Sequence, residues 1–237
     1  MSDAASRRLR HYTNIPFETF IALFTLLPFF ALAYSYSYLP ERVPLFLNLG
    51  GEVEVWGKKS LLSVFRVPLM AVITQAICLL MKYGAVQSAS LDLKAERAQL
   101  EEQYLHLEVG LWDWLRFAGA TKMSAASLDT IFLSLPRFKF LSRPTFVITA
   151  VAALLGVAGA LYYGYRLFVV RREMKARFVA KAGKTVDKQH VYGGLMYFNP
   201  SDSALFVNKY IFNFANKWVW VFIASIIAYP LLVFLPS

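Results

Sequence analysis

The strongest constraint on this chain is a set of three long stretches that contain no charged residue. They are 22, 22 and 20 residues long and cover Thr19 to Pro40, Pro144 to Tyr165 and Trp218 to Ser237. A helix of about 20 apolar residues is enough to cross a bilayer core of roughly 30 Å. The composition agrees, because 17% of the residues are charged, whereas an ordinary soluble domain has about 25%. We therefore expect an integral membrane protein.

Two further stretches extend this pattern. Residues 61–81 hold one charge near their start, Arg66, whose long side chain is expected to reach the lipid headgroups. Residues 116–136 are less hydrophobic and carry Lys122 and Asp129 in their interior. The sequence therefore predicts an all-α polytopic membrane protein with about five transmembrane helices, of which the third is marginal: residues 17–40, 61–82, 116–136, 144–166 and 218–237.

The distribution of Lys and Arg predicts how the chain is threaded. The loop from Arg166 to Lys217 holds ten of these residues, and basic loops face the cytoplasm. Five spans with a cytoplasmic basic N-terminus, residues 1–16, place sixteen Lys and Arg inside and seven outside, whereas four spans place eleven inside and fourteen outside. We expect five spans and an extracytoplasmic C-terminus. In the alternative, residues 117–136 lie on the membrane surface of a four-span chain whose N-terminus is outside.

The two charges of the marginal span are expected to share one helix face. Lys122 and Asp129 are seven residues apart, which is two helical turns. A charge at the bilayer centre costs about 3 kcal/mol, so this face should point into the helix bundle or towards a partner. The two residues are a possible intramembrane pair, for which a structural role is favoured over an ion pathway.

Two segments are expected in the cytoplasm. Residues 83–115 predict an amphipathic helix, capped by Ser90, that packs on its own protein, on the headgroups or on a protein partner. Residues 167–217 are basic, and each basic residue near an anionic leaflet contributes about 1 kcal/mol of attraction. Anionic lipid headgroups are therefore the expected partners of the net charge of +10, and nucleic acid is not.

The first loop, residues 41–60, is rich in residues that shape turns, and we expect it to be ordered. By composition alone, the favoured role is a loop packed on the helix ends. Its residues also resemble the extracytoplasmic loop of a membrane domain of unknown function found at the N-terminus of SdpI-type toxin-immunity proteins. The matching residues are Pro40, Glu41, Arg42, Val43, Pro44, Asn48, Gly51, Glu52, Glu54, Trp56, Gly57 and Lys59.

This resemblance implies that the loop binds a ligand or toxin outside the cell. Where the family has His-Phe before the asparagine, this chain has Phe46 and Leu47. The residues implied to contact the ligand are Glu41, Arg42, Asn48, Glu52 and Trp56.

A second motif lies in the basic segment. Asn199-Pro200-Ser201-Asp202 is a strong turn signal, and residues 195–198 and 205–207 are expected to form two short strands that pair across it as a hairpin. The stretch resembles a second small domain of unknown function with a Gly-Gly-x-x-Tyr-x-Asn-Pro-x-Asp core, which often follows the first in bacterial membrane proteins. Asn199 and Asp202 are its candidate binding residues.

The sequence offers no recognisable catalytic or metal-binding motif. Its one cysteine, Cys78, and three scattered histidines favour no metal site, and we expect no cofactor. The resemblance implies a non-enzymatic protein of the bacterial inner membrane that binds a protein partner or ligand, of the SdpI-like immunity or signalling type. The alternative is an accessory or scaffold subunit of a larger membrane complex.

Overall fold

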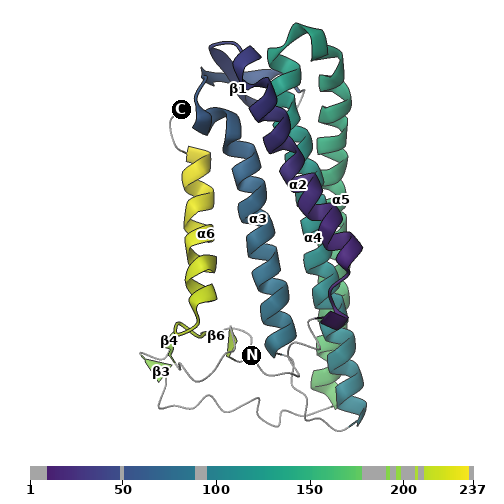
Figure 1. Ribbon diagram of the computed structural model, residues 1–237. Helices are drawn as coiled ribbons and strands as arrows, with labels where there is room; N and C mark the ends of the chain where they lie inside the picture. Colours follow the sequence, from purple (N-terminus) through teal and green to yellow (C-terminus); the bar gives the residue numbers. More distant parts are fainter. Residues whose placement is uncertain are drawn as a thin grey trace. The chain divides into compact units, whose positions relative to one another are not determined.

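The chain is mainly α-helical in the computed structural model (Figure 1), which describes residues 10–48, 51–88, 95–177, 191–192, 196–198, 206–207 and 211–234. Pairs of short strands lie between the helices. In chain order the elements are α2 (Ile15–Ser35), η1 (Tyr36–Tyr38), β1 (Arg42–Leu47), β2 (Val53–Lys58), α3 (Leu61–Ser88), α4 (Ala95–Ser134), η2 (Pro136–Leu141), α5 (Ser142–Arg177), β3 (Val191–Tyr192), β4 (Met196–Tyr197), β5 (Phe206–Val207), β6 (Ile211–Phe212) and α6 (Lys217–Phe234).

Within the described ranges, three helical segments are long and apolar enough to cross a membrane: Ile15–Tyr38, Leu61–Gln87 and Pro136–Met174. They coincide with the predicted spans 17–40, 61–82 and 144–166. Helix α6 lies where the last span is predicted, but its described apolar stretch, Lys217–Ala228, is shorter. These helices fit a membrane protein, and the count of about five spans stays a prediction.

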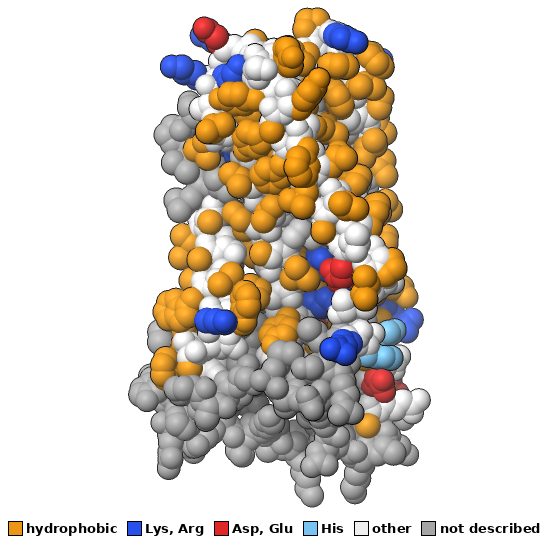
Figure 2. Space-filling model, in the orientation of Figure 1, with side chains coloured by type: hydrophobic (Ala, Val, Ile, Leu, Met, Phe, Trp, Pro, Cys, Tyr) orange, Lys and Arg blue, Asp and Glu red, His pale blue; other side chains and the backbone are white. Residues whose placement is uncertain are grey.

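The outer faces of these helices are apolar. Leu23 and Phe30 on α2 are 65% and 73% exposed, and Leu154 on α5 is 70% exposed. Figure 2 shows a face on which hydrophobic side chains far outnumber charged ones. An apolar surface of this kind is unfavourable in water, and a lipid environment removes that cost.

Helix α4 joins two segments that the sequence analysis treats as separate. The predicted cytoplasmic helix of residues 83–115, from Ala95 on, and the marginal span of residues 116–136 meet in one continuous helix of 40 residues, Ala95–Ser134. The first residues of the predicted cytoplasmic helix, 83–88, instead belong to α3. At 1.5 Å per residue it is about 60 Å long. The hydrogen-bond ladder continues because no proline interrupts Ala95–Ser134.

The described chain divides into two compact units. The first, here called the hairpin unit, contains the described parts of residues 15–75, 116–158 and 227–237. Its core is made of large aliphatic side chains from α2, β1, α3 and α4, and the segment after η1. These are Leu32, Leu39, Val43, Val64 and Ile131. Because Val43 belongs to β1, burial of this cluster anchors the β1–β2 hairpin to the helices.

The two strands of the hairpin are antiparallel, with Arg42 opposite Lys58 and Pro44 opposite Trp56. The register shifts on either side of Phe46, which marks an irregularity of the bulge type. Pro44 stands next to this irregularity, a place where a residue without an N–H is tolerated in a strand.

A buried polar network joins three helices of the hairpin unit. Arg116 on α4 is 2% exposed and donates two hydrogen bonds to the carboxylate of Glu18 on α2, at 2.9 and 2.6 Å. Its Nε donates to Oε1 of Gln75 on α3 at 3.1 Å, and Gln75 Nε2 donates to the Arg116 carbonyl at 2.9 Å. The bidentate pair satisfies a cation that would otherwise be buried alone.

The second unit contains the described parts of residues 1–14, 76–115 and 159–226. In it Lys82 of α3 forms an ion pair with Asp113 of α4 at 2.8 Å. The apolar side chains of this unit include two packed clusters. They are Tyr12, Ala85, Val86, Leu105 and Val109 in one cluster, and Met81, Phe212, Phe214, Val219 and Ile223 in the other.

The strands of the basic segment differ from the expectation. Strands β4 and β5 lie within the predicted residues 195–198 and 205–207, but they do not pair with each other among the described residues. Strand β4 pairs with β3, and β5 pairs with β6. A bridge from Tyr197 to Asn213 then connects β4 to the residue that follows β6. In the described part of the chain, strands β4 and β5 therefore each pair with the neighbouring strand on the side away from Asn199–Asp202, and not with each other as expected.

We expect loss of the Glu18 carboxylate to destabilise the protein. Glu18→Gln leaves the Arg116 guanidinium buried without its counter-charge and should lower the free energy of unfolding by about 3 kcal/mol. Glu102→Gln removes a carboxylate from an exposed position of α4 and is the matched control. Equilibrium unfolding in mixed micelles measures both variants, and equal stability of the two would contradict a structural role for the network.

Two glycines of α5 provide a second test of the packing. A Cβ at Gly159 would lie 1.8 Å from the Trp114 indole nitrogen, whereas a Cβ at Gly164 would meet nothing within 4 Å. We expect Gly159→Ala to lower the melting temperature, because overpacking typically costs about 1–3 kcal/mol. Gly164→Ala should leave it unchanged or raise it, since alanine favours a helix more than glycine does. A stable Gly159→Ala variant in thermal unfolding would refute this close α4–α5 contact.

Candidate binding cavity

Asn48 and Glu52 close the end of the β1–β2 hairpin. The Asn48 Nδ2 donates to Glu52 Oε2 at 3.2 Å, and the Glu52 backbone N–H donates to Asn48 Oδ1 at 2.9 Å. The Asn48 N–H also donates to the Glu52 carbonyl at 2.9 Å. Gly51 beside them has a φ of +79°, which a residue with a Cβ rarely adopts. Both predicted binding residues therefore also shape the loop.

The other predicted loop residues are on the hairpin surface. Glu41, Arg42 and Trp56 are all exposed, Trp56 by 48%. Their exposure leaves their side chains accessible to a binding partner. The base of the hairpin is held by Lys59, whose ammonium donates to the Leu39 carbonyl at 2.8 Å.

A cavity of about 570 Å³ lies within the hairpin unit, between the hairpin and helices α3, α4 and α5. Strand β1 and the residue after it contribute Phe46 and Asn48 to its lining. This volume is typical of a site for a small molecule, for which about 300–1,000 Å³ is usual. Its charged lining residues are Arg66, Lys122 and Asp129.

Arg66 has a different environment from the one expected. Its side chain is 5% exposed and lines the cavity, with the guanidinium carbon 5.9 Å from the centroid of the Phe46 ring. The hairpin folds back over this turn of α3 and covers the arginine. The expectation that the Arg66 side chain extends to the headgroups is therefore wrong, because tertiary contacts with the hairpin bury this side chain.

Lys122 and Asp129 both line the cavity, as expected for two residues on one helix face. Asp129 is 3% exposed and accepts a hydrogen bond from the Thr145 hydroxyl of α5. Lys122 is exposed, and no ion pair or hydrogen bond of its ammonium is found in the described part of the chain. The two residues share a site without forming an ion pair there.

Two predicted site residues do not belong to the described part of the chain. Asn199 and Asp202 lie outside the described residues. Among the residues that are described, no group of three His, Cys, Asp or Glu side chains is arranged to hold a metal ion.

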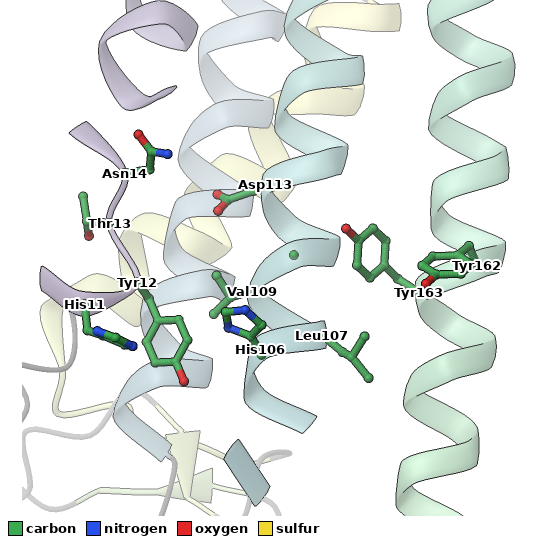
Figure 3. A pocket seen from close by; sticks show the side chains of 11 residues that line it. His11, Tyr12, Thr13, Asn14, His106, Leu107, Val109, Asp113, Tyr162 and Tyr163 are labelled. Carbon is green, nitrogen blue, oxygen red and sulfur yellow. The ribbon is translucent and has the colours of Figure 1, made fainter. Parts of the chain in front are cut away.

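A second cavity, of about 650 Å³, lies in the second unit (Figure 3). The Tyr12 ring lies between His11 and His106, with ring centroids 5.2 and 5.7 Å away. Asp113 supplies the one carboxylate of its described lining, and Lys82 donates to both oxygens of that carboxylate at 2.8 and 2.9 Å. Because this charge is already compensated, the cavity of the hairpin unit is the stronger candidate.

Two hydroxyl residues of α5 at this site were not predicted from the sequence: Thr149 lines the cavity, and the Thr145 hydroxyl donates to Asp129 of the lining. They are four residues apart in the uncharged stretch of α5, residues 144–165, so they share a face. The spacing of hydroxyl residues within a span is the signal that would have found them.

One comparison with known proteins gives a match, and it covers the N-terminal residues that contribute to this site. A family model described as a domain of unknown function (DUF1648) matches residues 23–72. The match includes the hairpin and Arg66, and it ends before α4 and α5. No curated protein and no solved structure matches the chain.

Proposed function

We propose that this chain is a non-enzymatic integral protein of the bacterial cytoplasmic membrane that binds a ligand or protein partner from the extracytoplasmic side. The observation that carries the proposal is the position of the hairpin. It presents Trp56 outward and also forms one wall of the cavity that contains Arg66, Lys122 and Asp129. The resemblance to SdpI-like proteins suggests an immunity or signalling role for this binding.

The proposed threading has five spans, a cytoplasmic N-terminus and an extracytoplasmic C-terminus. It is supported by the contacts of the marginal segment within the hairpin unit. Ser124 of α4 donates to the Phe24 carbonyl of α2 at 2.8 Å, and a Cβ at Gly156 of α5 would lie 3.2 Å from the Ala118 Cβ. Small residues and buried hydroxyls suit a helix enclosed by other helices.

Binding is favoured over catalysis by the state of one hydroxyl group of the cavity lining, that of Ser63. Ser63 lines the cavity, but its hydroxyl donates to the Lys58 carbonyl at 2.7 Å and lies 2.7 Å from the Ser60 hydroxyl. These bonds form the beginning of α3, where such serines satisfy free backbone groups. Ser63 therefore has a capping role, and the cavity contains charged groups suited to recognition.

We expect a photoreactive residue at Trp56 to capture the binding partner in intact cells. A p-benzoylphenylalanine in place of Trp56 should give one specific adduct, identified by mass spectrometry after mild extraction. The same residue in place of Leu154, which is 70% exposed on an apolar helix face, is the control and should capture lipid. A stoichiometric protein adduct at Leu154 with none at Trp56 would instead favour the scaffold-subunit function.

The threading has its own test. Cys78 is the one cysteine of the sequence, so a Cys78→Ala background allows introduced single cysteines to report exposure. We expect Glu54→Cys to react with a membrane-impermeant maleimide in intact cells, and Arg172→Cys to react after permeabilisation only. Protection of Glu54→Cys in intact cells would contradict an extracytoplasmic hairpin.

A further inference from the structure

The cavity of the hairpin unit has an excess of positive charge that bears on what it binds. Its described lining includes the cations Arg66 and Lys122 and one carboxylate, Asp129. The carboxylate accepts its hydrogen bond from Thr145, and the Lys122 ammonium has no hydrogen bond or ion pair to another described residue. In a membrane-embedded site such a cation is costly unless an anion accompanies it.

Thr149 supplies an independent observation. Hydroxyl groups in these helices commonly donate to the carbonyl four residues earlier, as Thr74 does to Met70 at 2.9 Å and Ser127 does to Met123 at 2.6 Å. The Thr149 Oγ1 is buried, lines the cavity and makes no hydrogen bond within the described part of the chain. A buried donor of this kind is expected to meet an acceptor on a ligand.

Most of the remaining lining residues of the cavity are apolar, and Asn48, Ser63 and Thr130 are the other polar ones in its described lining. Small and branched side chains from α3, α4 and α5 leave the space open, and the Phe146 ring lies against the hairpin at Gly51. The volume of about 570 Å³ accommodates a small polar group with part of an apolar chain. The apolar members that surround the charges are Val67, Ala126, Leu133, Phe146, Ala150 and Ala153.

We propose that this cavity binds the acidic group of a singly charged amphiphile, either a carboxylate or a phosphodiester. Lys122 and Arg66 bind the anion, and the Thr149 hydroxyl donates to one of its oxygens. Asp129 leaves a single excess positive charge in the lining, which favours a monoanion over a dianion. The inference rests on the proposed binding function and specifies its ligand class. A fatty acid and an anionic phospholipid both have the required chemistry.

The test is native mass spectrometry of the full-length protein with defined additives. Oleate and dioleoyl phosphatidylglycerol are the two acidic probes, and oleyl alcohol and dioleoyl phosphatidylcholine are their uncharged or zwitterionic counterparts. We expect one copy of an acidic probe to bind per chain, and the probe retained identifies the source of the anion. Tighter binding of the counterparts, or equal binding of all four probes, would overturn the proposal.

Variants then locate the site. Lys122→Met should weaken binding of the retained probe at least about tenfold, because a charge-assisted hydrogen bond is lost. Thr149→Val, which keeps the shape of the side chain, should weaken it to a smaller extent. Lys139→Met removes an exposed lysine of η2 outside the cavity lining and is the control. The assignment would be overturned if Lys122→Met and Lys139→Met weakened binding of the probe equally. It would also be overturned if neither Lys122→Met nor Thr149→Val weakened binding.

The same variants separate this inference from the proposed function. If acidic probes do not bind but the Trp56 adduct forms in cells, the proposed ligand class is wrong, and the adduct on the hairpin still supports the binding function. If the Trp56 adduct is also absent, the proposed function itself fails.

Discussion

The hairpin unit depends on one buried cation. Arg116 lies in a helix that is covered by its neighbours, where a guanidinium is tolerated only with a counter-charge and further acceptors. Glu18 of α2 and Gln75 of α3 provide them, so three helices are tied together at one point. Because the guanidinium and the carboxylate are planar, the two parallel hydrogen bonds also restrict the orientation of α2 relative to α4. This constraint holds α4 in place beside the cavity.

The low hydropathy of residues 116–136 follows from their position. Helices α2 and α5 present large apolar side chains outward, whereas α4 buries Ser124, Ser127 and Asp129 among its neighbours. A helix enclosed by other helices does not need an apolar surface on all sides, so it can carry polar groups that would be costly in contact with lipid. The segment that is weakest as an isolated span therefore supplies two of the three charged residues of the described cavity lining, Lys122 and Asp129.

Local sequence patterns predicted where loops and strands form better than they predicted which strands pair. The turn-forming residues of 41–60 indicated an ordered loop, and the structure has an antiparallel hairpin there, closed by Asn48 and Glu52. The short strands at 195–198 and 205–207 were also expected, yet each pairs with a different strand from the one assumed. Strand propensity is a property of a few residues, whereas pairing depends on which backbone groups the rest of the fold brings within reach.

The sequence by itself determined the membrane character of the chain, because apolar length and the absence of charge are properties that each segment has alone. Helical periodicity likewise placed Lys122 and Asp129 on one face. Only the tertiary structure decided that this face lines a cavity, and that Arg66 lies inside it under the hairpin. The burial of the Thr149 hydroxyl at this cavity was decided in the same way. The physical reason is that burial of a side chain is set by elements distant in sequence, so a single stretch of residues does not contain the information.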